Sequence, residues 1–217
     1  AGWDAKRRLL EETLAERPGP PHLHNDVLIL VHSSRLRRTY GKLLMDIVRK
    51  RFGAAALSQP DIQTFHVFLQ RLFTRTNYRT LIDETSRLVL LEWIVKDYVT
   101  GRALFGSAAG LIAPSLAAAV AEMIEELGAA GVTADRLADA VAQSDFSDKP
   151  QVRLLLDAYT RYGNVLADKG MIDPAGMLNH LADTFDPSWF TGYRRIIIDG
   201  MYTATDLEAA VLRKILA

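Results

Sequence analysis

A continuous apolar run, DVLILV at residues 26–31, is the feature that most restricts the possible folds. The run does not alternate between polar and apolar residues, and its branched side chains are typical of a strand buried on both faces of a parallel sheet. A second run of this kind, RRIIIDG, lies at residues 194–200. Parallel strands need long, usually helical, crossover connections. We therefore expect an α/β fold with helices on both faces of a parallel sheet.

Helical and strand patterns alternate only near the two ends of the chain. The N-terminal part predicts, in order, a helix over 3–16, the strand at 26–31, a helix over 35–52, and a short strand that turns into a helix at 64–73. From about residue 85 to residue 185 only helical patterns occur, and a strand and a final helix follow. The patterns predict an α/β core interrupted by an all-α subdomain, with the core over residues 1–84 and 191–217 and the subdomain over residues 85–190.

Some predicted helices carry residues that are typical of helix ends. Gly128 and Gly170 each follow a helical pattern, and we expect both to act as C-cap residues. Asp173 followed by Pro174 predicts an N-cap with proline at the first helical position.

Composition excludes several classes of protein. The chain has 217 residues, of which 49% are hydrophobic, so it is long enough for a sizeable core. No apolar run reaches the roughly 18 to 20 residues of a membrane-spanning helix, and the charged N-terminus lacks the apolar centre of a secretory signal. Without cysteine there are no disulfides or thiolate metal sites, and the five histidines show no metal-ligand spacing. We expect a cytoplasmic protein with no membrane partner and no bound metal.

Charge is spread unevenly, although the formal net charge is zero. Residues 35–79 contain ten arginines and lysines against two aspartates, whereas residues 83–145 contain ten acidic residues against four basic ones. A basic segment in a neutral protein favours a local face that binds a polyanion. Ordinary solvated helix faces are the alternative that composition leaves open.

Two places in the chain partly match a phosphate-binding loop. Gly41 and Lys42 resemble the end of that motif, but leucines replace its first glycine and its hydroxyl residue, so the match is accidental. Lys6, in the segment AGWDAKR, stands where the lysine of such a loop would stand. Trp3 occupies a place that needs glycine, and Arg7 replaces the Ser or Thr that would hold magnesium.

Asp199 ends the second strand run. An aspartate in this place suits a metal-bound water in nucleotide hydrolysis, which also needs a base or water-orienting group beside it. Gly200 supplies none, and Tyr202 and Thr203 are polar without carrying a carboxylate. The alternative is an aspartate that only forms a turn or caps a helix.

The segment TFH, residues 64–66, lies at a predicted strand-to-helix turn within the basic segment. A hydroxyl, an aromatic ring and an imidazole in this place suit contact with a phosphate and stacking on a base. The alternative is that Thr64 caps the helix while Phe65 and Phe68 pack in the core.

These motifs follow one another in an order that resembles the first motor domain of superfamily 1 helicases of the UvrD-like kind. LILVHSS at 28–34 resembles the family's threonine-rich DNA-contacting motif, and TFH at 64–66 resembles its motif of the same letters. GMIDPAGMLNHLADTF at 170–185 is similar to the segment that leads back from the helical subdomain 1B. IIIDGMYTATDLEAAVLRKIL at 196–216 resembles the acidic motif and its helix. The resemblance covers nearly the whole chain and implies a P-loop-NTPase-like fold with 1B as the insertion.

Departures from the family pattern imply a motor domain that has lost its ATPase activity. Asp199 matches the first acid of the DEFQD motif, but Gly200 replaces the catalytic glutamate, Tyr202 the glutamine and Thr203 the last aspartate. The chain thus resembles the inactivated helicase-like half of AddB-type subunits, which precedes a PD-(D/E)XK nuclease domain in complexes that process double-strand DNA breaks. This resemblance implies an N-terminal fragment of a larger repair exonuclease or helicase-nuclease subunit. The fragment would bind DNA and act as a scaffold, with no catalytic residue and no cofactor.

The resemblance also implies a set of DNA contacts and the remnant of a nucleotide site. The expected contacts to DNA, in single-stranded form, are Ser33, Ser34, Arg35, Arg38, Thr64, Phe65 and His66, and the remnant is Lys6 with Asp199. The expected protein partner is a helicase-nuclease subunit. Two other functions stay open. One is an active DNA helicase that uses ATP and magnesium, with a P-loop upstream of residue 1. The other is a scaffold that binds only a partner protein through the acidic helical insertion.

Overall fold

The structure, a computed structural model, describes residues 2–16, 26–53, 61–102, 109–202 and 204–216. They form two compact units. The first comprises residues 1–72 and 186–203, and the second comprises residues 73–185 and 204–217. None of the helices in the described ranges combines the length and apolar character needed to cross a bilayer.

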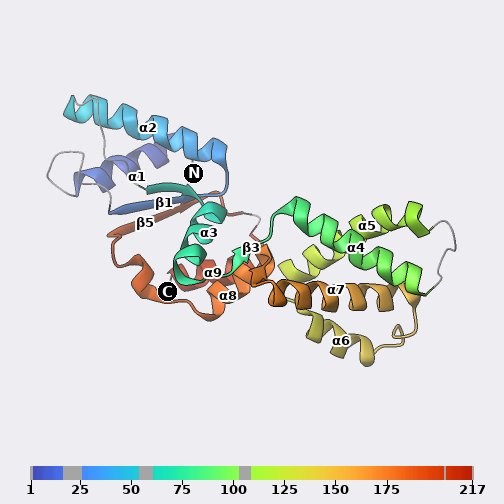
Figure 1. Ribbon diagram of the computed structural model, residues 1–217. Helices are drawn as coiled ribbons and strands as arrows, with labels where there is room; N and C mark the ends of the chain where they lie inside the picture. The colour runs from blue at the N-terminus through green and yellow to red at the C-terminus, as the bar shows by residue number, and fades with distance from the viewer. Residues whose placement is uncertain (1, 17–25, 54–60, 103–108, 203, 217) are drawn as a thin grey trace. The chain divides into compact units, whose positions relative to one another are not determined.

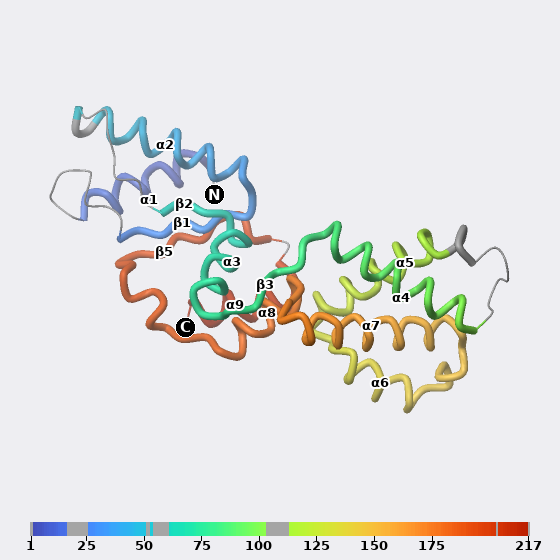
Figure 2. The backbone as a smooth tube through the Cα atoms, in the orientation of Figure 1, coloured from blue at the N-terminus to red at the C-terminus, as the bar shows by residue number. Residues whose placement is uncertain are grey.

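The first unit is built on a three-stranded parallel sheet. Its elements are α1 (Trp3–Ala15), β1 (Val27–Val31), α2 (Ser34–Phe52), β2 (Asp61–Thr64), the start of α3 (Phe65–Thr76), a short 3₁₀ helix (Pro187–Phe190) and β5 (Arg195–Asp199). The strand order is β2-β1-β5, so the first apolar run forms the central strand (Figure 2). Every residue of β1 is buried, whereas only Ile197 is fully buried in the edge strand β5. The predicted α/β fold with a parallel sheet is confirmed at this level.

Helices α1 and α2 lie together over one face of this sheet (Figure 1). Buried residues of both helices pack against the alternate strand residues Val27, Ile29 and Val31. Side chains alternate along a strand, so these three point to the same face. Leu28 and Leu30 point to the opposite face and are also fully buried. The central strand is therefore covered on both sides, as its unbroken apolar sequence predicts.

The register of the parallel strands places their carboxyl-terminal ends side by side at one edge of the sheet. Val31 at the end of β1 lies opposite Thr64 of β2 and Asp199 of β5. In open parallel sheets, ligands bind outside the carboxyl ends of the strands. Three segments at the strand ends meet at this edge, which we call the carboxyl edge. They are formed by residues 32–34, 64–66 and 199–200.

The second unit is mainly helical. Its elements are β3 (Thr80–Leu81), α4 (Glu84–Gly101), α5 (Ala109–Ala129), α6 (Ala134–Ala142), α7 (Pro150–Asp168), β4 (Met171–Ile172), α8 (Pro174–Asp183) and α9 (Asp206–Leu216). Helices α4, α5 and α7 enclose one apolar core, which contains Leu91, Ile124 and Ala158 (Figure 1). Arg87, 7% exposed, joins α4 to α5 because its guanidinium binds Glu84 at 3.0 Å and Glu125 at 2.8 Å.

Two details of the second unit differ from what we expected. We found only helical patterns up to residue 185, yet β4 pairs in parallel with β3. A two-residue strand between two helices is too short to show a strand period, so the sequence pattern missed it. We also grouped residues 73–84 and 204–217 with the sheet, whereas these residues belong to the second unit. Leu207 and Val211 of α9 are buried there, and Leu207 packs beside Gly131.

The predicted helix ends are correct with one exception. Asp173 accepts a hydrogen bond from the Gly176 N–H at 2.7 Å and Pro174 follows it, as predicted. Gly170 adopts a φ of 62° just after α7. Gly128 was wrongly assigned as a C-cap, because α5 continues to Ala129 and Gly131 takes the left-handed conformation, with φ at 73°. Gly128 instead permits close packing, since a Cβ there would lie 2.8 Å from the Cβ of Ala175.

Candidate functional site

An ion pair between α1 and β5 occupies the carboxyl edge. The Lys6 ammonium lies 2.5 Å from Oδ2 of Asp199, and the Tyr40 hydroxyl of α2 donates to the same oxygen at 2.9 Å. The two charged side chains are only 16% and 13% exposed. The two residues that we assigned to a nucleotide-site remnant are therefore in direct contact, although they are 193 positions apart in the chain.

The aromatic rings of Trp3 and Tyr40 lie near the Lys6 ammonium. Trp3 packs edge-on against Tyr40 with 6.1 Å between the ring centroids, and the Lys6 ammonium lies 4.9 Å from the Trp3 ring. An ammonium held near an aromatic face gains electrostatic stabilisation from the ring quadrupole. Lys6, Asp199, Tyr40 and Trp3 thus form a self-contained cluster, which we call the Lys6–Asp199 cluster.

The surroundings of Asp199 keep its carboxylate ionised. Burial by itself would raise the pKa of Asp199, but the hydrogen bonds from Lys6 and Tyr40 and the Lys6 charge outweigh it and lower the pKa. Burial raises the pKa of Tyr40, and the neighbouring Asp199 carboxylate raises it further. Near neutral pH, Asp199 is therefore an anion and Tyr40 a neutral donor.

Gly200, directly after Asp199, is held in a conformation that suits glycine alone. Its φ is 80°, in the left-handed region that L side chains rarely adopt. A Cβ at this position would lie 3.0 Å from Nδ1 of His32 and 3.0 Å from Cδ1 of Leu36. Position 200 thus has neither the backbone conformation nor the space for a longer side chain such as glutamate.

The other residues near this cluster have the following surroundings. Arg7, in the place of the magnesium-binding hydroxyl residue, pairs with Glu11 at 3.1 Å and lies 4.0 Å from Asp46. Within the described ranges, no three His, Asp or Glu side chains gather as a metal site requires. Tyr202 is 84% exposed, and Thr203 lies outside the described residues.

The candidate DNA contacts on α2 lie at the start of that helix. The Ser33 hydroxyl caps the helix by accepting the Leu36 N–H at 3.3 Å. Ser34, Arg35 and Arg38 are exposed. Among the residues that the structure describes, neither arginine forms an ion pair with a carboxylate. The first turn of a helix presents free N–H groups and the positive end of its dipole, so it favours anions.

The TFH segment divides into exposed and buried residues. Thr64 is half-buried at the end of β2, and His66 is exposed on the first turn of α3 with its Nε2 2.9 Å from the Gln70 amide nitrogen. Phe65 is 1% exposed and packs in the core. Stacking of Phe65 on a base, which we considered from the sequence, is incompatible with this burial. The core role that we gave as its alternative is the observed one.

Sequence reasoning missed the partners that complete the cluster. From the sequence we gave Tyr40 no role, and we considered Trp3 only as a residue that a phosphate-binding loop does not accommodate. The role of Tyr40 has no local signal in the sequence, because its hydroxyl finds its hydrogen-bond partner 159 positions away. The polar end of a tyrosine on an otherwise apolar helix face was the one available hint, since buried tyrosine hydroxyls usually find a hydrogen-bond partner.

Replacement of Tyr40 by phenylalanine is expected to lower the free energy of unfolding by about 1.5 kcal/mol, because a hydrogen bond to a charged acceptor is lost without a change in ring packing. Urea unfolding followed by circular dichroism measures the change. Tyr78→Phe is the matched control, since Tyr78 is 92% exposed and its loss of a hydroxyl should change stability by less than about 0.5 kcal/mol. Equal effects of the two substitutions would contradict the assigned hydrogen bond.

Comparisons with known proteins do not identify a family. No protein-family model matches the sequence, and a search of curated proteins gives no match to it.

Proposed function

We propose that the chain is a catalytically silent, helicase-like domain of a larger DNA-repair nuclease, which binds single-stranded DNA and acts as a scaffold in the processing of double-strand breaks. The observation that carries this proposal is the carboxyl edge. There, exposed cationic and hydroxyl side chains lie near an aspartate that accepts hydrogen bonds from Lys6 and Tyr40.

Binding of DNA is supported by the chemistry around the start of α2. Ser34, Arg35 and Arg38 offer hydroxyl and guanidinium donors next to the positive end of a helix dipole. Arginine and hydroxyl donors at such places bind phosphate oxygens and position a strand without reading its sequence. His66 adds an exposed imidazole at the next strand end, in register with β1. This set suits a backbone that carries closely spaced phosphates.

Absence of ATP hydrolysis is supported by the Lys6–Asp199 cluster and by Gly200. Oδ2 of Asp199 already accepts two donors, and Gly200 supplies no base to orient a water. Hydrolysis of a phosphoanhydride needs both a metal-binding group and a positioned water. An active helicase therefore finds no support in the geometry of these residues.

A scaffolding role is supported by the charge of the second unit. The exposed side chains of α5 include Glu122, Glu125 and Glu126, and no basic residue occurs in this helix. A phosphate backbone is repelled by such a face, whereas a partner protein can accept it. We therefore assign DNA binding to the carboxyl edge and binding of the partner subunit to the second, helical unit.

Fluorescence anisotropy with a labelled single-stranded oligonucleotide tests the proposal. We expect binding in the micromolar range at low salt, falling steeply as salt rises, because released counterions drive contacts to phosphates. The triple variant Arg35→Ala, Arg38→Ala and His66→Ala should weaken binding by at least about 10-fold, since each phosphate contact contributes separately.

Two variants that each remove one positive charge provide the control for this test. Arg38→Ala removes one charge at the start of α2, and Lys50→Ala removes one exposed charge about three turns further along the same helix. We expect a clear loss of affinity for Arg38→Ala and little for Lys50→Ala. Absence of binding at low salt, or equal loss in the two variants, would overturn the assignment of the surface.

A further inference from the structure

The last part of the basic segment, residues 73–79, has no role in the contacts proposed so far. It belongs to the second unit, and residues 62–82 contain three arginines and no acidic residue. Arg75 in the last turn of α3 and Arg79 before β3 are exposed, and neither forms an ion pair with a carboxylate of the described residues. Two cationic side chains of this segment can therefore bind an anion.

Tyr78 lies between these two arginines in the sequence. Among the large hydrophobic side chains of the described residues it is the most exposed, at 92%. Nearly the whole phenol ring is therefore in contact with water. An exposed aromatic ring next to arginines is the combination with which proteins bind single-stranded nucleic acid, because bases stack on the ring and guanidinium groups bind phosphates.

Hydrogen bonds hold the backbone on both sides of Tyr78. The Asn77 side chain accepts the Arg79 N–H at 2.9 Å. The Thr80 N–H donates to the Gly170 carbonyl at 3.1 Å, where β3 begins to pair with β4. The ring therefore projects into solvent from a backbone that is already ordered. A ligand that stacks on it does not have to order a loop, which would reduce its affinity.

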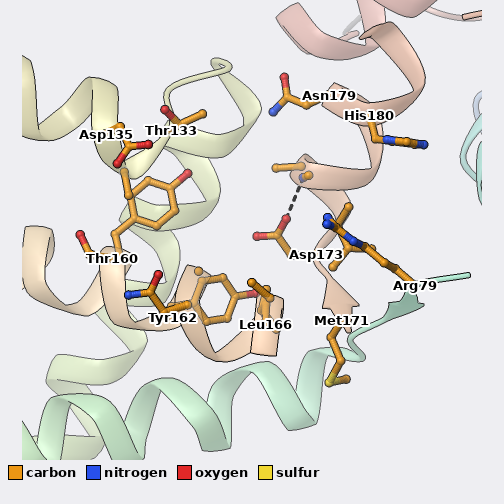
Figure 3. Close-up of a pocket in the computed structure, with 18 of the residues that line it drawn as sticks. Arg79, Thr133, Asp135, Thr160, Tyr162, Leu166, Met171, Asp173, Asn179 and His180 are labelled. Atoms are coloured by element: carbon orange, nitrogen blue, oxygen red, sulfur yellow. Dashed lines mark hydrogen bonds between the residues drawn. The ribbon is translucent and has the colours of Figure 1, made fainter. Parts of the chain in front are cut away.

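Arg79 also lines a polar cavity of about 510 Å³ in the second unit (Figure 3). The Asp173 carboxylate lines the same cavity, but it accepts the Gly176 N–H at 2.7 Å and forms no ion pair with Arg79. The guanidinium donors of Arg79 therefore remain available to a phosphate. A carboxylate in the same cavity opposes an anion, so we expect Arg75 to contribute more than Arg79.

We propose that Tyr78 is a stacking platform for a base of single-stranded DNA, and that Arg75 and Arg79 bind phosphates next to that base. This inference rests on the proposed binding of single-stranded DNA and adds a second contact surface, separate from the residues of the carboxyl edge. Tyrosine and arginine are also common in protein interfaces. Two unpaired guanidinium groups in a segment without acidic residues favour a polyanion instead.

Fluorescence anisotropy with labelled oligothymidine, applied to Tyr78→Ala and Tyr78→Phe, tests the stacking. We expect Tyr78→Ala to weaken binding by about 10-fold, because one stacked base is lost. Tyr78→Phe keeps the ring and should change affinity by less than about twofold. Both variants should keep the fold, since the side chain is 92% exposed. Unchanged affinity in Tyr78→Ala, or an equal loss in Tyr78→Phe, overturns the proposal.

An abasic oligonucleotide of the same length separates stacking from contacts to phosphate. It keeps the phosphates and lacks the bases, so the original protein should bind it more weakly than oligothymidine. Tyr78→Ala should cause no further loss with the abasic strand. An equal loss with both oligonucleotides would show that Tyr78 does not stack on a base, and would overturn the proposal.

Phe146→Ala is the matched control for removal of an exposed ring. Phe146 is 54% exposed and has the Lys149 ammonium 4.3 Å from its ring centroid, but Asp145 and Asp148 flank it in the sequence. Because these carboxylates repel phosphates, we expect its loss to change DNA affinity by less than about twofold. A loss equal to that of Tyr78→Ala would overturn the assignment of the surface.

Arg75→Ala tests the phosphate contact. The slope of log affinity against log salt concentration should become shallower by about 0.7, the value for one contact to a single strand. Lys96→Ala, which removes an exposed charge of α4, should leave the slope unchanged. An unchanged slope in Arg75→Ala overturns the assigned contact.

The carboxyl edge and the Tyr78 surface can fail separately. Full binding in Tyr78→Ala, together with loss of binding in the triple variant of Arg35, Arg38 and His66, overturns this inference alone. The reverse pattern supports the Tyr78 surface and overturns the assignment to the carboxyl edge.

Discussion

Replacement of Asp199 by alanine is expected to lower the free energy of unfolding by about 2 to 3 kcal/mol. The reason is that Lys6 would keep an ammonium that is 16% exposed and has lost its carboxylate. Breaking a buried ion pair on one side costs about 3 to 5 kcal/mol, and the partial exposure of this pair places it at the lower end. Urea unfolding at pH 7 measures the change.

This effect should depend on pH with a defined sign. The pKa of Asp199 is lowered in the folded protein, so its contribution to stability is fully present above the unfolded pKa of about 3.9. It is lost as pH falls through the folded pKa. The difference between the original protein and Asp199→Ala should therefore be constant from pH 7 to pH 5 and shrink below about pH 4.

Asp168→Ala is the matched control for charge removal, because Asp168 is exposed at the end of α7. We expect it to change stability by less than about 0.5 kcal/mol. A similar small change in Asp199→Ala would mean that the Lys6–Asp199 pair does not hold α1 to the sheet.

Replacement of Gly200 by glutamate is expected to destabilise the protein by about 2 to 3 kcal/mol and to produce no ATP hydrolysis. The backbone φ of 80° strains any L side chain. The new Cβ would also lie 3.0 Å from the His32 ring. Adding the missing carboxylate therefore does not rebuild a hydrolytic site. Thermal unfolding and a steady-state phosphate-release assay with DNA present measure the two effects.

Gly192→Ala and Gly200→Ala form the control pair for the backbone effect. A Cβ at Gly192 meets no atom within 4 Å, and its φ is not in the left-handed region. Gly192→Ala should therefore be neutral or slightly stabilising, whereas Gly200→Ala should cost about 1 to 2 kcal/mol. Measurable ATP turnover in Gly200→Glu would show that the site retains the rest of a catalytic machinery, against the proposed silent role.

Local signals in the sequence were sufficient for the main elements. The unbroken apolar run of β1 predicted a strand buried on both faces, and Asp173 and Gly170 predicted helix ends correctly, because each acts through neighbours within a few residues. The side-by-side ends of β1, β2 and β5 follow from parallel pairing, which also has a sequence signal.

Features that depend on distant residues could not be predicted in this way. Tyr40 meets Asp199 only after the sheet has formed, and the left-handed φ of Gly200 depends on the turn that it enters. Phe65 offered an aromatic ring in a basic segment, but only the packing of the first unit decides that the ring is buried. Long-range packing overrides local pattern in each case, and it decided which candidate contacts remain available to a ligand.

Nuclear magnetic resonance titration of the chain with a short single-stranded oligonucleotide tests the central claim most directly. Backbone amide signals of residues 32–38 and 64–67 should shift progressively with added DNA at low salt, and signals of α5 should not. The shifts should shrink as salt is raised, because phosphate contacts are screened. Absence of shifts in both segments, or shifts confined to the second unit, would contradict DNA binding at the carboxyl edge.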